Sequence, residues 1–181
     1  MRILERADEM KRHTGFRFCP RCGGKSIESH LDKAMLCSGC GFLYFHNTAS
    51  AVAVILESGD GVLLSRRNAD PGRGMLDLPG GFVDYGESCE SALRREIREE
   101  TGMELGALTY FGSFPNAYRY GDVMYFTTDV VYIAAMPAGF PVKVNAEIQE
   151  MVLVRPESVD FNALAFEVTK GVLKAYWRIG D

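Results

Sequence analysis

The chain has 181 residues, of which 47% are hydrophobic and 24% are charged, with a formal net charge of -4. This length suits one full domain with a small additional piece and excludes two large domains. The negative charge argues against non-specific binding of nucleic acid, so we expect no nucleic-acid partner, and any polyanionic substrate would need metal ions or a local basic patch.

The first segment is short and carries mixed charges. Ile3, Leu4, Ala7 and Met10 recur at helical spacing, which predicts a short amphipathic helix over residues 3 to 13. The segment lacks the apolar stretch of a signal peptide, and no apolar run approaches the roughly 18 residues that a membrane helix needs. The sequence therefore predicts a cytoplasmic protein with no membrane partner.

Residues 16 to 45 contain two Cys-x-x-Cys pairs, each followed by glycine: Cys19, Cys22, Cys37 and Cys40. The total of five cysteines is odd, which together with the absence of an export signal fits metal binding better than disulfides. Two such turns provide tetrahedral S₄ coordination, which suits zinc, with an Fe–S centre or a redox dithiol as the alternative. Because four protein ligands leave no open position, we predict a structural zinc ribbon, folded mainly by its metal.

The rest of the chain predicts alternating strands and helices. Residues 49 to 56 and 62 to 65 are apolar runs separated by a Ser-Gly-Asp-Gly turn, which predicts a hairpin before a loop over residues 68 to 74. The later predicted elements are a helix from Ser88 to Thr101 that ends at Gly102, strands from Val123 to Ala134 and from Met151 to Val154, and a helix from Ala163 to Trp177. We place the domain boundary near Asn47, which gives a helix and zinc ribbon over 1–47 and a larger domain over 48–181.

The helix from Ser88 to Thr101 carries three glutamates on one face. Residues three and four apart are neighbours on a helix, so Glu96 lies beside both Glu99 and Glu100. Carboxylates this close repel one another unless a cation lies between them, and hard divalent ions such as Mg²⁺ or Mn²⁺ accept oxygen ligands of this kind. Arg95 is one turn from Glu99 and can orient a carboxylate by hydrogen bonding. Gly81 stands in a paired-glycine turn that allows the backbone to approach a ligand closely.

These residues stand at the spacing of a known motif. The pattern from Gly81 through Glu87 and Arg95-Glu96-Ile97 to Glu99-Glu100 and Gly102 resembles the complete Nudix box. The resemblance implies an α/β/α sandwich around a mixed sheet, and hydrolysis of nucleoside diphosphates linked to another group X. It also implies that Glu96, Glu99 and Glu100 bind Mg²⁺ or Mn²⁺, that Glu87 and the Gly81 carbonyl are further ligands, and that Arg95 orients the carboxylates.

The family resemblance leaves the general base open, because members differ in the residue that activates water. We favour Glu99, with Glu147 as the alternative from a later loop and Glu150 in the same loop; the opposing interpretation of the loop pair is ordinary surface charge. Arg66 and Arg67 follow the second predicted strand, where an arginine in this family often faces the substrate phosphates. The alternative for both is a charge on an edge strand.

A zinc ribbon before a Nudix domain is similar to the NADH pyrophosphatase group. That group carries Ser-Gln-Pro-Trp-Pro-Phe-Pro-x-Ser after the box, whereas here only Ser113 and Pro115 match and Tyr118 is an aromatic replacement that can stack on a base or ribose. The resemblance therefore implies an ADP-containing metabolite, such as NAD(H) or ADP-ribose, without specifying which. The alternative function is a nucleotide-sensing regulator whose ribbon contacts protein or nucleic acid. Many relatives are dimers, so a homodimer is also expected.

Overall fold

The computed structural model describes residues 16–31, 34–121, 123–137 and 144–179. The helix predicted over residues 3 to 13 lies outside these ranges. The chain divides into two compact units, one formed by Met1–Thr48 with Arg119–Tyr125 and the other by Ala49–Tyr118 with Phe126–Asp181. Whether the boundary predicted near Asn47 separates independently folding domains stays a prediction. Within the described ranges, no helix is both long and apolar enough to span a membrane.

The first unit contains a small antiparallel sheet of three strands. Its strands, in the spatial order β1-β2-β3, are β1 (Ile27–His30), β2 (Ala34–Cys37) and β3 (Leu43–Phe45). Ala34, Met35 and Cys37 on β2 are buried, whereas all three residues of β3 are exposed. So few buried apolar side chains provide little hydrophobic stabilisation, which agrees with a fold that depends on bound metal.

The second unit is built on a mixed sheet. The predicted hairpin is confirmed, since β4 (Ala49–Ser58) pairs antiparallel with β5 (Gly61–Arg67), while β4 pairs in parallel with β9 (Val123–Ala135). The main strand order is β10-β5-β4-β9-β8, with two short strands attached to β5 and β4 respectively. The remaining strands are β6 (Leu76–Asp77), β7 (Gly80–Phe82), β8 (Thr109–Tyr120) and β10 (Ile148–Val154).

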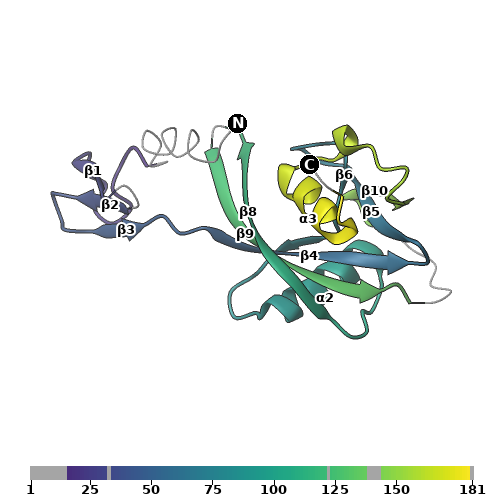
Figure 1. Cartoon of the computed structure of the whole chain (residues 1–181). Helices are drawn as coiled ribbons and strands as arrows, with labels where there is room; N and C mark the ends of the chain where they lie inside the picture. The colour runs from purple at the N-terminus through teal and green to yellow at the C-terminus, as the bar shows by residue number, and fades with distance from the viewer. Residues whose placement is uncertain (1–15, 32–33, 122, 138–143, 180–181) are drawn as a thin grey trace. The chain divides into compact units, whose positions relative to one another are not determined.

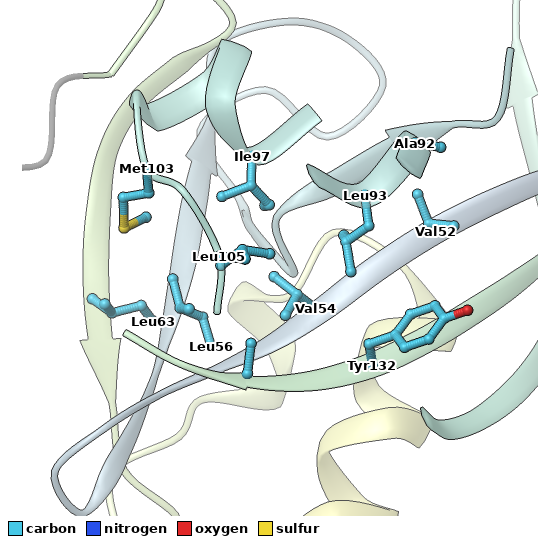
Figure 2. Close-up of a cluster of buried hydrophobic side chains, with 11 residues drawn as sticks. Val52, Val54, Leu56, Leu63, Ala92, Leu93, Ile97, Met103, Leu105 and Tyr132 are labelled. Carbon is cyan, nitrogen blue, oxygen red and sulfur yellow. The ribbon is translucent and has the colours of Figure 1, made fainter. Parts of the chain in front are cut away.

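Two helices cover the two faces of this sheet (Figure 1). Side chains alternate between the faces of a strand, and on β4 Val54 joins the cluster that packs on α2 (Cys89–Thr101), whereas its neighbour Ile55 joins the cluster that packs on α3 (Glu167–Trp177). Figure 2 shows the first cluster, in which Leu93 and Ile97 of α2 face the strands. The predicted α/β/α sandwich with a mixed sheet is therefore confirmed.

The predicted limits of α2 agree closely with the structure. The Ser88 side chain accepts a hydrogen bond from the Ser91 N–H as the N-cap, and Gly102 ends the helix in the left-handed conformation with φ 74°. The last helix, in contrast, begins at Glu167 rather than at Ala163, so that prediction was wrong at its start. Leu164 forms a parallel bridge with Leu76, and Phe166 is extended, because this stretch pairs with β6 before the helix begins.

Strand β8 is absent from the sequence prediction. Its sequence includes Gly112 and Pro115, which usually interrupt a strand. Because β8 is the last strand in the spatial order, one of its sides is not paired within this sheet, and a proline without an N–H is tolerated on that side.

Candidate active site

The packing of α2 directs its acidic side chains away from the core. Ala92, Leu93 and Ile97 are fully buried against the sheet. The three predicted ligands consequently differ in exposure: the side chain of Glu99 is 57% exposed and that of Glu96 is 17% exposed, whereas Glu100 is 8% exposed as a residue. One carboxylate of the box therefore faces solvent and two lie inside the site.

Arg95 donates hydrogen bonds to three of the box carboxylates. Its guanidinium donates hydrogen bonds to both oxygens of Glu87 at 2.8 Å each, to Glu96 at 2.8 Å and to Glu99 at 3.3 Å. It also donates to the Phe82 carbonyl at 3.0 Å, which ties the helix to the end of β7. This arginine keeps like-charged side chains together where they would otherwise repel one another.

The paired glycines form the opposite wall of the site. Gly80 has φ 151°, and a Cβ at this position would overlap the Val52 carbonyl on β4. A Cβ added at Gly81 would overlap the carboxylate of Glu96. Only glycine lets this turn pass so close both to the sheet and to the acidic face of α2, so the turn leaves a cradle directly against the Glu96 carboxylate.

Glu100 is the most constrained carboxylate of the site. Its Oε2 atom is buried without a hydrogen-bond partner among the described residues. Burial, reinforced by the nearby charge of Glu96, raises the pKa of Glu100 to about 8, although the Gly80 backbone N–H opposes the shift. Burial also raises the pKa of Glu96. Buried carboxylates with an unsatisfied oxygen are the ligands that a hard divalent cation would satisfy, so the donor set fits such an ion.

The described residues do not hold these oxygens in a closed cluster. Across 16–31, 34–121, 123–137 and 144–179, only the four cysteines place three or more ligand atoms within 4.8 Å of one another. Arg95 holds the exposed Glu99 while Glu100 is buried, so the carboxylate oxygens do not converge on one point.

The two predicted loop glutamates, Glu147 and Glu150, have different surroundings in the structure. The Asn145 N–H donates to the Glu100 backbone carbonyl at 3.0 Å, which brings the loop to the end of α2, and the charge of Glu147 contributes to the raised pKa of both Glu96 and Glu100. Burial remains the main cause of both shifts. Glu150, in contrast, forms an ion pair with Arg66 at 2.7 Å. Of the two, Glu147 is the one that lies beside the acidic site.

The predicted phosphate-binding arginines both have protein partners. Arg66 also donates to the Gly74 carbonyl at 2.9 Å. Arg67 donates to the Pro71 carbonyl at 2.8 Å and to Asp77 at 3.3 Å, and its guanidinium lies 5.0 Å from the ring centre of Phe166. Tyr118 contacts the same Phe166 ring, with centroids 5.6 Å apart. Arg67 and Tyr118 therefore meet at one aromatic side chain.

Two aspartates near this point were missed in the sequence: Asp129, which is buried, and Asp77, whose side chain is 15% exposed. Asp77 accepts hydrogen bonds from the Thr169 hydroxyl at 2.5 Å and from the Leu78 N–H at 2.9 Å. Burial raises its pKa to about 6, and the charge of Asp129 adds to the shift. Asp129 is itself 9% exposed. The available signal was a single aspartate within an otherwise apolar strand sequence, at Leu-Asp-Leu and at Asp-Val-Val-Tyr.

The four ribbon cysteines are brought together as predicted. Their sulfur atoms all lie within 4.8 Å of one another, with Cys19 to Cys40 at 3.7 Å and Cys22 to Cys37 at 3.8 Å. Burial raises the pKa of the Cys19 thiol, but hydrogen bonds from backbone N–H groups lower it by more, to about 7. The Phe42 backbone N–H lowers that of Cys40, yet burial and the neighbouring cysteines raise it to about 12. A bound cation is therefore needed for all four thiols to be deprotonated at the same time.

Comparison with known proteins agrees with this geometry. The sequence profile of the family described as NUDIX domain matches residues 46–175. A protein of Vibrio atlanticus named NAD-capped RNA hydrolase NudC is 34% identical over 113 residues, which are 62% of this chain and 42% of that protein. A protein of the same name from Haemophilus influenzae is 33% identical over 115 residues, 62% of this chain and 44% of its own length. The chain thus spans less than half of these relatives.

Solved structures show the same fold. A NUDIX hydrolase from Nitrosomonas europaea superposes with a TM-score of 0.66 at 23% identity, over 90% of this chain and 91% of the other. The NUDIX domain of Shewanella oneidensis NrtR, in a structure complexed with ADP ribose, superposes with a TM-score of 0.60 at 24% identity, over 75% and 91%. At these identities the likeness concerns the fold alone.

Proposed function

The chain belongs to the NUDIX family, and on that basis we propose that it hydrolyses the pyrophosphate bond of a nucleoside diphosphate linked to a second group. The observation that supports this most is the buried carboxylate of Glu100, whose Oε2 lacks a partner among the described residues and which lies near Glu96 and the glycine turn. A buried unpaired carboxylate lowers stability, so its presence in a cradle of this kind indicates a role in binding.

The cation that we propose is Mg²⁺ or Mn²⁺, held by Glu96, Glu99 and Glu100 with the Gly81 carbonyl. When bound, it would neutralise pyrophosphate oxygens and lower the pKa of a coordinated water. Arg95 holds Glu96 and Glu99 in place through its hydrogen bonds. Arg95 donates one hydrogen bond to each oxygen of Glu87 in this structure, so a cation bound by Glu87 would share an oxygen with Arg95 or displace it.

The proton of the attacking water is proposed to pass to a glutamate at the edge of the site. Glu99 is the favoured acceptor because its side chain is exposed beside the buried carboxylates, and Glu147 is the alternative because its charge acts on the same two side chains. Arg66 and Arg67 each use Nε and Nη1 for their present partners, so further N–H donors of either guanidinium could contact phosphate without exchanging a partner. In Arg67 the guanidinium already lies against Phe166.

An ADP-containing metabolite is the proposed substrate class. The relatives' name specifies NAD-capped RNA, and the ligand of the NrtR structure is ADP ribose, so NAD(H), ADP-ribose and NAD-capped RNA are the compounds to compare. The negative net charge favours the small metabolites over RNA. We also propose zinc as the ion of the four cysteines, while the cytoplasmic location and the homodimer stay predictions.

Product analysis tests this proposal. The purified chain is incubated with each compound and Mg²⁺ or Mn²⁺, and the products are resolved by mass spectrometry in H₂¹⁸O. From NAD(H) and ADP-ribose we expect AMP and the complementary monophosphate, and from NAD-capped RNA we expect nicotinamide mononucleotide and a 5′-monophosphate RNA; in each case one ¹⁸O enters one of the two product phosphates. Binding of ADP-ribose without turnover would instead favour the regulator. If the chain neither binds nor hydrolyses any of these compounds, the result contradicts the proposal.

Variants distinguish the two candidate bases. At Mn²⁺ concentrations that saturate each variant, Glu99→Gln is expected to lower kcat by at least about 100-fold without unfolding the chain, and Glu147→Gln by less than about tenfold, if Glu99 accepts the proton. The matched control is Glu104→Gln, because Glu104 is an exposed partner of Arg98 just beyond the helix. The reverse order of effects would assign the base to Glu147, and wild-type activity in both variants would exclude the two residues.

A further inference from the structure

A hydrogen-bonded pair of side chains lies on the α3 side of the sheet, away from the acidic helix. Asn116 on β8 donates from Nδ2 to Oδ2 of Asp129 on β9 at 3.3 Å, and the other oxygen of Asp129 accepts from the Thr127 hydroxyl. Asp129 shares its face of β9 with the buried Val131, which belongs to the cluster packed on α3. The pair therefore connects two strands on the face opposite α2.

This arrangement fixes the orientation of the Asn116 amide. A carboxylate only accepts hydrogen bonds, so the amide nitrogen must face Asp129 and the amide oxygen must face away. No other side-chain hydrogen bond of Asn116 is found among the described residues, and its amide oxygen is not among their buried unpartnered atoms. Asn116 thus presents an oriented acceptor that is accessible to a ligand.

An aromatic side chain lies next to this acceptor. Tyr118 is two residues from Asn116 on the same strand, so both side chains leave the same face of β8. The Tyr118 ring packs on Phe166, which in turn contacts Arg67. An aromatic ring beside a single oriented acceptor is a common arrangement for binding a flat heterocycle, with one hydrogen bond for selectivity.

Strands β9 and β4 connect this surface with the glycine turn of the proposed metal site. Asp129 pairs with Ala51 on β4, and Ala51 pairs with Phe82, the residue after Gly81. Two strand spacings, about 10 Å, therefore separate the backbone of Asp129 from that of Phe82. Asp77 lies near both Asp129 and Glu100: the charge of Asp129 contributes to the raised pKa of Asp77, and the charge of Asp77 contributes to that of Glu100. Asn116 and Tyr118 lie one strand further on β8, so roughly 14 Å separates their backbone from the glycine turn, and a nucleoside bound there would extend across β9 and β4 to place its phosphates at the metal site.

We propose that Asn116 is a specificity-determining residue, which accepts a hydrogen bond from an amino group on the substrate's heterocycle while that ring stacks on Tyr118. The inference rests on the proposed function and narrows its substrate class to amino-bearing rings such as adenine. Asp129 is a positioning residue, which prevents the amide from turning its nitrogen toward the ring. A carbonyl at the same ring position, as in hypoxanthine, would place two acceptors against each other.

The test compares ADP-ribose with its hypoxanthine analogue, in which a carbonyl replaces the amino group and the neighbouring ring nitrogen carries a proton. We expect kcat/KM of the wild-type chain to be at least about tenfold higher for ADP-ribose. Asn116→Ala should reduce this ratio to about one, mainly through KM, and Asp129→Asn should reduce it as well because the amide is no longer oriented. Thr109→Ala, at an exposed position of the same strand, is the control and should keep the wild-type ratio.

A second measurement needs no variant and no turnover. AMP and IMP carry the two heterocycles, and we expect AMP to bind the wild-type chain at least about tenfold more tightly by calorimetry. Equal binding of AMP and IMP, or an unchanged substrate ratio in folded Asn116→Ala, would overturn the inference. If no compound is hydrolysed but AMP still binds in preference to IMP, the proposed function fails and this recognition site stands.

Discussion

Glu100 shows how a single residue links the stability of the protein to its proposed chemistry. Its burial raises its pKa to about 8, so at pH 7 the metal-free protein holds a proton that a cation must displace. The affinity for Mn²⁺ should therefore increase by up to about tenfold per pH unit between pH 6 and 8 and level off above that. Calorimetry across this range measures how the affinity changes with pH. Glu100→Gln should lower the affinity for Mn²⁺ and remove most of its pH dependence. A flat profile in the wild-type chain would contradict the assignment.

Asp77 gives a prediction about stability that is independent of metal. Burial raises its pKa from 3.8 to about 6, so its stabilising contribution is complete below pH 4 and is lost as the pH rises through 6. The free energy of unfolding should fall by up to about 3 kcal/mol across this window, and by less in practice because the side chain is 15% exposed. Urea unfolding of the wild-type chain and of Asp77→Asn measures the difference, and parallel pH curves for the two would refute the prediction.

At the scale of elements, the sequence predicts what local signals specify. Ser88 and Gly102 define α2 because capping depends on neighbouring backbone groups alone. The start of α3 was misplaced because Leu164 bridges Leu76, far away along the chain, and such pairing leaves no local pattern. The sequence likewise placed Glu96, Glu99 and Glu100 on one helix face but not the different directions of their side chains, which depend on Arg95 and on burial.

The glycine turn between β6 and α2 should be required for metal binding. Gly81→Ala should displace the Glu96 carboxylate and weaken Mn²⁺ binding by at least about tenfold, while the urea midpoint changes little because the side chain of Glu96 is flexible. Gly74→Ala is a glycine control outside the site, where no atom lies within 4 Å of an added Cβ, although its positive φ adds strain. Unchanged metal affinity in Gly81→Ala would show that the turn does not shape the site.

At the scale of the whole molecule, the two units should lose their structure separately. Cys22→Ser removes one of four clustered thiols, so zinc content should fall from about one per chain and residues 16–48 should lose protection from hydrogen exchange. The sheet from β4 to β10 has its own two apolar clusters and should keep its protection. Retention of full zinc content would refute the ribbon.

The cysteine spacing predicted this cluster because its ligands are close in sequence, whereas contacts such as Asp77 with Thr169 cross 92 positions and were not predictable.

Crystals soaked in Mn²⁺ would show whether the acidic side chains of α2 bind a divalent cation opposite the glycine turn. We expect an anomalous peak at the manganese edge between the carboxylates of Glu96 and Glu100, with Glu99 turned inward from Arg95. Clear density for these side chains in their present hydrogen bonds, with no anomalous peak at saturating Mn²⁺, would contradict the account.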